Sequence, residues 1–87
     1  MKIALFGNER NAACGMVRPL LVSTCDQYGM DFEEFSTDKD SKVFEKYAVS
    51  GIPVMIVFDD SDNELGRFMG LQTSTSIVNY LRKFGAI

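Results

Sequence analysis

The side chains best suited to chemistry in this sequence are its two cysteines, Cys14 and Cys25. Disulfide reduction requires an attacking thiolate and a second thiol close enough to release the mixed disulfide. Both cysteines lie in one predicted helix, so the rise of an α-helix places their Cα atoms about 16 Å apart. A disulfide requires Cα atoms within about 7 Å of each other. The two thiols therefore cannot pair, and we interpret Cys25 as a buried core residue.

Cys14 lies at the start of that predicted helix. Asn11 is a favourable N-cap residue, which makes Cys14 the third residue of the helix. Backbone N–H groups and the helix dipole at this position favour a thiolate, and the cationic side chain of Arg10 acts in the same direction. Two interpretations follow. Cys14 is either a reactive single thiol or a buried, inert cysteine in a helix that Asn11 caps.

The composition argues against several other classes of site. The chain has no histidine, which excludes a histidine-based catalytic triad and argues against zinc, so we expect neither a metal nor a cofactor. Its net charge is −3, with acidic and basic residues interspersed. Such a surface has no basic region for nucleic acid and no polybasic membrane anchor. The apolar run at residues 1–6 is too short for a signal peptide or a membrane span, and we expect a cytoplasmic monomer.

The first half of the chain is predicted to be strand, helix, strand, helix. The predicted ranges are 2–6, 12–28, 32–35 and 41–48. In the first helix, apolar residues recur at three- and four-residue spacing from Met16 to Tyr28. Pro19 is expected to kink this helix and Gly29 to end it. The segment 36–38 is predicted to cap the second helix, with Val43, Phe44, Tyr47 and Ala48 facing inward.

The second half is organised around residues 54–58, a run of five apolar residues that Pro53 precedes. A run this short and continuous is typical of a strand buried on both faces. Proline is tolerated at the first position of such a strand. Gly51 allows a tight approach of the chain to this strand.

The remaining elements are a hairpin and a helix. The segment 59–63 is predicted to be a polar turn, since it lacks the spacing of a calcium-binding loop. A fourth strand follows at 64–69 and ends at Gly70. The last helix is capped by Thr73 or Ser74. Its buried side is formed by Ile77, Tyr80, Leu81 and Phe84.

The resulting order is β-α-β-α-β-β-α within a single domain, residues 1–87. The β-α-β opening predicts two parallel strands joined by a right-handed crossover. The last two strands form an antiparallel hairpin. We therefore predict an α/β protein with a four-stranded mixed sheet and helices on both faces.

This order, with a proline opening the third strand, resembles the thioredoxin and glutaredoxin family. Residues 47–54 are similar to the thioredoxin segment in which a tyrosine precedes Gly-Ile-Pro-Thr. Pro19 follows Cys14 by five residues, as the kink proline follows the second active-site cysteine of thioredoxins. The resemblance covers the whole chain and leaves out only the extra N-terminal strand and helix of full-length thioredoxins. Its compact form is similar to glutaredoxins and small phage thioredoxins. Further matches are Asp38, Gly70, Ile77, Tyr80 and Leu81.

The resemblance implies a thioredoxin-like fold with a cis Ile52–Pro53 peptide bond beside the active-site turn. It also implies a groove for protein substrates, in which the backbone of Ile52 offers a donor and an acceptor to an extended peptide. The implied partners are protein thiols and disulfides, or an extended peptide of a partner protein. The substrate-binding residues would be Arg10, Ala12, Ala13, Ser50, Gly51, Ile52, Pro53, Gly70 and Leu71.

The active-site motif departs from the family pattern. Family members carry Cys-x-x-Cys, whereas residues 11–14 are Asn-Ala-Ala-Cys. Cys14 corresponds to the second, resolving cysteine, and Asn11 stands at the position of the first, attacking cysteine. The two tryptophans that flank the motif in thioredoxins correspond to Gly7 and Arg10. The buried aspartate that accepts a proton in thioredoxins corresponds to Leu5.

Two functions remain open. In the first, the protein is at most a monothiol redox protein whose catalytic residues are Cys14 and Asn11, and glutathione or a partner's thiol completes turnover. The glutathione signatures of glutaredoxins are missing, since residues 52–54 are Ile-Pro-Val instead of Thr-Val-Pro. In the second, the protein is a redox-silent binding module that uses the cis-proline groove. The burial and reactivity of Cys14 distinguish the two.

Overall fold

A four-stranded mixed sheet forms the middle layer of the computed structural model, which describes residues 1–87. Strand β1 (Lys2–Gly7) lies inside the sheet, parallel to β2 (Asp31–Ser36) and antiparallel to β3 (Val54–Phe58). Strand β4 (Glu64–Met69) pairs antiparallel with β3. The strand order is therefore β2-β1-β3-β4, with β2 and β4 at the edges.

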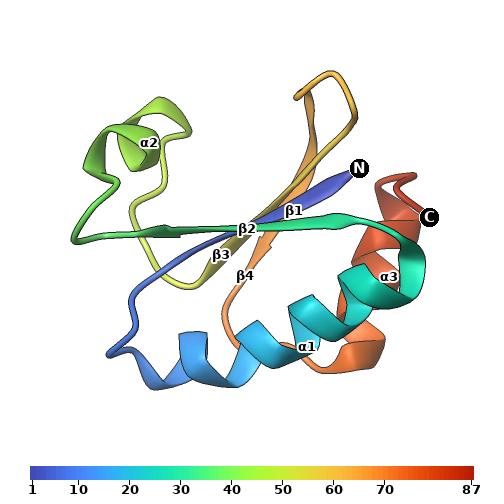
Figure 1. Ribbon diagram of the computed structural model, residues 1–87, viewed down its shortest axis with the longest axis horizontal. Coiled ribbons are helices and arrows are strands. Elements are labelled where there is room, and N and C mark those ends of the chain that lie inside the picture. Colours follow the sequence, from blue (N-terminus) through green and yellow to red (C-terminus); the bar gives the residue numbers. More distant parts are fainter.

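Three helices cover the two faces of this sheet. Helices α1 (Ala12–Tyr28) and α3 (Ser74–Lys83) lie together on one face, and α2 (Ser41–Lys46) lies on the other, as Figure 1 shows. The element order is β-α-β-α-β-β-α, so the predicted α/β architecture is confirmed. None of the three helices has the length and apolar character needed to cross a membrane.

The central strands are buried on both faces because successive side chains alternate between two cores. In β1, Ile3 and Leu5 belong to the larger core, which also contains side chains of α1 and α3. Ala4 and Phe6 belong to the smaller core with Phe44 of α2. All five residues of β3 are buried in the same alternating way. This arrangement accounts for the continuous apolar run in the sequence of β3.

Helix α1 begins and ends where the local sequence predicts. The side-chain oxygen of Asn11 accepts the N–H of Cys14 at 3.0 Å, and Gly29 ends the helix in the left-handed conformation with φ of 66°. The helix continues through Pro19, which is exposed. Met16 was predicted to lie in the buried stripe, and this prediction is wrong, because its side chain is 62% exposed. The buried side of the helix is formed by Cys14, Val17, Leu21, Thr24 and Cys25.

Helix α2 differs from the prediction at both ends. Its N-cap is Asp40 instead of a residue of the 36–38 segment. The carboxylate of Asp40 accepts the N–H of Ser36 at 2.8 Å and does not cap its own helix. The helix ends at Lys46, before the predicted end at Ala48. Ala48 is exposed instead of facing inward and has a φ of 54°. A left-handed residue cannot continue a right-handed helix, so Ala48 turns the chain toward β3.

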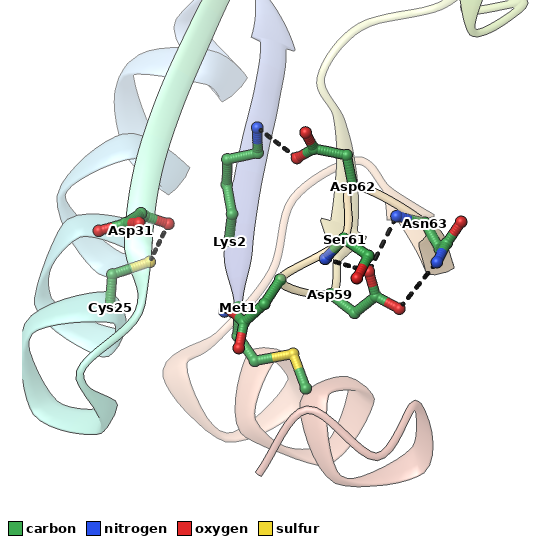
Figure 2. A network of polar contacts seen from close by, with 9 residues as sticks. Met1, Lys2, Cys25, Asp31, Asp59, Ser61, Asp62 and Asn63 are labelled. Carbon is green, nitrogen blue, oxygen red and sulfur yellow. Dashed lines mark hydrogen bonds and ion pairs between the residues drawn. The ribbon is translucent and has the colours of Figure 1, made fainter.

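The turn and the last helix agree with the sequence prediction. The Asp59 carboxylate accepts the backbone N–H groups of Ser61 and Asn63, both at 2.9 Å, as Figure 2 shows. Thr73 is the N-cap of α3, and the side chains of Thr73 and Ser76 each accept the other's backbone N–H. Such a reciprocal box satisfies two N–H donors at the helix start. In this last helix and its C-cap, the predicted side chains Ile77, Tyr80, Leu81 and Phe84 pack in or against the larger core.

The contact between Gly66 and Phe84 leads to a first prediction. A Cβ added to Gly66 would lie 2.5 Å from the nearest ring atom of Phe84. Gly66→Ala should therefore lower the free energy of unfolding by about 1–3 kcal/mol, because the ring has to move. Gly15→Ala is the matched control, since nothing lies within 4 Å of its added Cβ. Urea denaturation measures both variants, and equal stability of the two would contradict the prediction.

The conformation of Ala48 leads to a second prediction. The left-handed conformation costs a residue with a Cβ about 1–2 kcal/mol, whereas glycine adopts it freely. The greater flexibility of glycine in the unfolded chain offsets about 0.4–1 kcal/mol of this gain. We expect Ala48→Gly to raise the free energy of unfolding by up to about 1 kcal/mol. A loss of stability in urea denaturation would show that the Ala48 methyl group contributes more by packing than its conformation costs.

Candidate functional site

Three segments of the chain meet at one end of the sheet. Phe6 pairs with Val54, so Gly7 and Pro53 reach the same end of β1 and β3. The N–H of Gly70, which follows β4, donates to the carbonyl of Pro53 at 2.9 Å. The chain leaves β1 at this end and enters α1 after a short loop (Figure 1). The structure thus brings together the start of α1, the proline segment and the end of β4, the three parts of the predicted groove.

The proline segment presents free backbone groups. The Ile52–Pro53 peptide bond is cis, as the resemblance implied. Pro53 is buried, while Gly51 and Ile52 are half-buried. Neither the N–H nor the carbonyl of Ile52 has a hydrogen-bond partner within the chain. Ile52 therefore offers one donor and one acceptor beside the proline.

Cys14 is buried completely, with an exposed fraction of 0%. A Cβ added to Gly7 would lie 2.6 Å from its Sγ, so the sulfur packs directly against the Cα of Gly7. The same added Cβ would lie 3.3 Å from the Cβ of Cys14, so the whole side chain of Cys14 lies close to Gly7. The backbone N–H of Cys14 donates to the side chain of Asn11. Of the two interpretations that the sequence allowed, the structure shows the buried cysteine.

Arg10 lies on the surface beside the loop that follows β2. Its side chain is 82% exposed, and its guanidinium pairs with the carboxylate of Asp38 at 3.2 Å. The side chain of Asn8 donates to Thr37 and Asp38 as well, at 2.6 and 3.3 Å. These contacts tie the loop after β1 to the loop after β2. The guanidinium of Arg10 therefore has its ionic partner in the loop after β2.

Arg18, which the sequence analysis did not single out, forms the best ion pair on α1. Its guanidinium binds the carboxylate of Glu34 on β2, with the closest atoms 2.6 Å apart. This hydrogen bond raises the pKa of Arg18 above its ordinary value. The pair links α1 to the edge strand β2 one helical turn after Cys14. In the sequence, Arg18 and Glu34 look like ordinary charged surface residues, so no sequence signal indicated that they pair.

Cys25 is a core residue, as predicted. It is 3% exposed and its Sγ donates to the backbone carbonyl of Asp31 at 3.6 Å, as Figure 2 shows. Burial raises the pKa of its thiol to about 11, and the carboxylates of Asp26 and Asp31 act in the same direction. Cys25 is therefore protonated at neutral pH and is not a nucleophile.

The remaining predicted binding residues lie along the same end of the molecule and differ in exposure. Ala12 is exposed and Leu71 is 60% exposed, whereas Ala13 and Gly70 are half-buried. Sequence reasoning missed Met69, the last residue of β4, which is 63% exposed. Alternation with the buried Phe68 places Met69 on the opposite face of β4, but the sequence does not show that this face is open to solvent.

The fold and this site define a thioredoxin-like protein. The family model for thioredoxin matches residues 6–83, and the chain belongs to the thioredoxin family. A curated relative is the thioredoxin of Chlamydia pneumoniae, which is 32% identical over 71 residues, covering 80% of this chain and 69% of the relative.

Solved structures of thioredoxins share the fold. Thioredoxin 1 of Thermosipho africanus superposes with a TM-score of 0.85 at 20% identity, covering 97% of this chain and 93% of that one. A thioredoxin from Nicotiana alata gives a TM-score of 0.83 at 19% identity, covering 95% of this chain and 71% of that one. At such identities the likeness concerns the fold.

The raised pKa of Cys25 leads to a third prediction. Its pKa is about 11 in the folded protein against an ordinary value of 9.0. Between pH 9 and 11 the unfolded chain loses the thiol proton while the folded protein keeps it. The free energy of unfolding therefore falls as the pH rises from 9 to 11. At pH 8 the alkylation of Cys25 should be at least about 100-fold slower in the folded protein than in urea, because the thiolate is scarcer and the buried sulfur is inaccessible. Mass spectrometry of the peptide that contains Cys25 measures the rate, and similar rates in both states would contradict the prediction.

Proposed function

We propose that this thioredoxin-family protein binds an extended segment of a partner protein along Ile52–Pro53 and does not cycle a dithiol. The burial of Cys14 is the observation that carries the proposal, since its sulfur has no access to solvent. Asn11 occupies the position of the attacking cysteine and supplies an amide, which is not a nucleophile. With no second thiol in reach, the protein cannot release a mixed disulfide by itself.

The recognition mode follows from the free backbone groups of Ile52. An extended peptide that lies beside Ile52 can accept its N–H and donate to its carbonyl, as an added strand does at a sheet edge. The adjoining surface contains the exposed apolar side chains of Met69 and Leu71. Apolar and polarizable side chains of this kind suit a protein partner. Thioredoxin-family members act on protein thiols and disulfides. The partner segment in this proposal is therefore part of a protein that carries such groups.

Monothiol redox activity at Cys14 is the second candidate. The residue lies in the first turn of α1, where backbone N–H groups favour a thiolate. This candidate requires the start of α1 to move away from Gly7, so that a disulfide of the partner or of glutathione reaches the sulfur. The rate of thiol alkylation distinguishes the two candidates.

The packing of Cys14 against Gly7 leads to a fourth prediction. Iodoacetamide at neutral pH should alkylate Cys14 at least about tenfold more slowly than the same residue in the urea-unfolded chain, because the buried sulfur is inaccessible. Gly7→Ala should speed the reaction, since the added Cβ would lie 2.6 Å from Sγ and displace it. Gly15→Ala, next to Cys14 but with open space around its added Cβ, is the control. Rapid alkylation of the wild-type protein would favour the monothiol candidate.

The Asn11 position leads to a fifth prediction. The wild-type protein should show little or no reduction of insulin with dithiothreitol, as measured by turbidity. Asn11→Cys should gain a disulfide and measurable activity, because the side chain at position 11 lies 3.0 Å from the backbone nitrogen of Cys14 and the change restores a Cys-x-x-Cys motif. Loss of the cap should lower the free energy of unfolding by about 0.5–2 kcal/mol, which circular dichroism can verify.

Cys14→Ser is the matched control for this assay. If the wild type is fully active and Cys14→Ser abolishes that activity, the proposal that the protein lacks dithiol cycling is wrong. A folded but inactive Asn11→Cys variant would show that residues besides Asn11, such as Leu5 at the position of the family's proton-accepting aspartate, also prevent catalysis.

A further inference from the structure

A small pocket adjoins the Ile52–Pro53 segment on the side of β4. Its volume is about 220 Å³, and most of its lining is apolar. It lies between the segment that follows α2 and the end of β4. The lining residues are Ala48, Val49, Ser50, Gly51, Val54, Arg67, Phe68 and Met69.

The pocket is continuous with the proposed groove. Gly51 directly precedes Ile52, and Val54 directly follows Pro53. On the opposite wall, Met69 precedes Gly70, whose N–H binds the carbonyl of Pro53. A peptide whose backbone pairs with Ile52 therefore passes the mouth of this pocket. Side chains alternate along an extended peptide, so one of them can point into the pocket.

The walls of the pocket suit an apolar side chain. A Cβ added to Gly51 would lie 3.6 Å from the terminal methyl group of Met69, so the Met69 side chain spans the space above Gly51. Met69 is nevertheless 63% exposed, which leaves its thioether free to move toward an occupant. Ala48 contributes to the same wall from a left-handed conformation that is costly for alanine.

Arg67 is the one charged residue in the lining of the pocket, and its guanidinium is paired with the carboxylate of Glu64 beside the pocket. No lining residue is acidic, although the chain as a whole carries a net charge of −3. The guanidinium donates to both oxygens of Glu64 and to the carbonyl of Tyr47. These three contacts do not use all of its N–H donors. The Arg67 side chain is 37% exposed, so the remaining donors can meet a carboxylate from outside.

We propose that this pocket determines which segment the protein binds. It receives one apolar side chain of the partner segment, and Arg67 selects a segment with an acidic residue beside that side chain. The inference rests on the proposed function, since it assigns the partner chemistry of the same groove. The partner is thus an extended segment that carries an adjacent pair of one apolar and one acidic residue.

Three synthetic peptides test the inference against the 87-residue chain. The first is Thr-Thr-Leu-Glu-Thr-Thr, the second has Gln in place of Glu, and the third has Gly in place of Leu. Titration of the ¹⁵N-labelled protein by NMR gives both the affinity and the residues affected. We expect the first peptide to shift Ile52, Gly70, Val49 and Met69 and to bind about fivefold more tightly than either of the others.

Two protein variants test the charge of Arg67 and the wall of the pocket at Met69. Arg67→Gln should remove the preference for Glu over Gln, whereas Arg82→Gln, an exposed cation on α3, should retain it. Because Arg67→Gln also loses contacts within the protein, Met69→Glu provides a second test at an exposed position. Met69→Glu should weaken the Glu peptide at least about fivefold more than the Gln peptide. Val22→Glu, on the partly exposed side of α1, is its control.

The outcomes separate the inference from the proposed function. Equal binding of all three peptides, with shifts only at Ile52 and Gly70, would overturn the role of the pocket and leave the groove intact. A preference for Glu that survives both Arg67→Gln and Met69→Glu would also overturn it. If no peptide shifts Ile52 or Gly70 at any concentration, both the inference and the proposed groove are wrong.

Discussion

The close packing of Cys14 on Gly7 determines how helix α1 meets the sheet, and the site depends on that contact. The sulfur occupies the space where any side chain at position 7 would begin. The start of α1 can approach the end of β1 because glycine has no Cβ. Asn11 then caps the helix directly above. In this chain the thiol contributes to packing, and its burial places the first turn of α1 against the end of β1.

Position and burial act in opposite directions at Cys14. The sequence interpretation of a reactive thiol rested on its place in the first turn of the helix. Packing against Gly7 removes the sulfur from solvent, and a reagent cannot reach it without moving the helix. Access to the sulfur therefore limits any reaction. Asn11 adds to this effect, since its hydrogen bond stabilises the first turn that would have to move.

The groove does not require a reactive thiol. Its elements are the unpaired backbone groups of Ile52, the exposed side chains of Met69 and Leu71, and the pocket that Arg67 borders. All of them follow from the sheet, because β3 begins beside the end of β4 and the N–H of Gly70 donates to the carbonyl of Pro53. A thioredoxin-family scaffold can thus retain a recognition surface where the redox pair is incomplete.

The sequence by itself determined the elements and most of their ends. Local patterns suffice for the apolar run of β3, the Asn11 cap and the Gly29 stop, because each depends on residues only a few positions apart. The absence of a second cysteine near Cys14 was equally evident, since it follows from helix geometry. The resemblance to thioredoxins supplied the cis Ile52–Pro53 bond, which composition does not indicate.

Only the tertiary structure decided the burial of Cys14, the pairing of Arg10 with Asp38 and the exposure of Met69. Each depends on residues distant in the sequence: Gly7 approaches the helix, Asp38 follows another strand, and the edge position of β4 leaves Met69 uncovered. The left-handed turn at Ala48 was unexpected because alanine normally favours continuation of a helix. The chain requires that turn to bring Pro53 back to the sheet, and such a requirement exists only once the strands are paired.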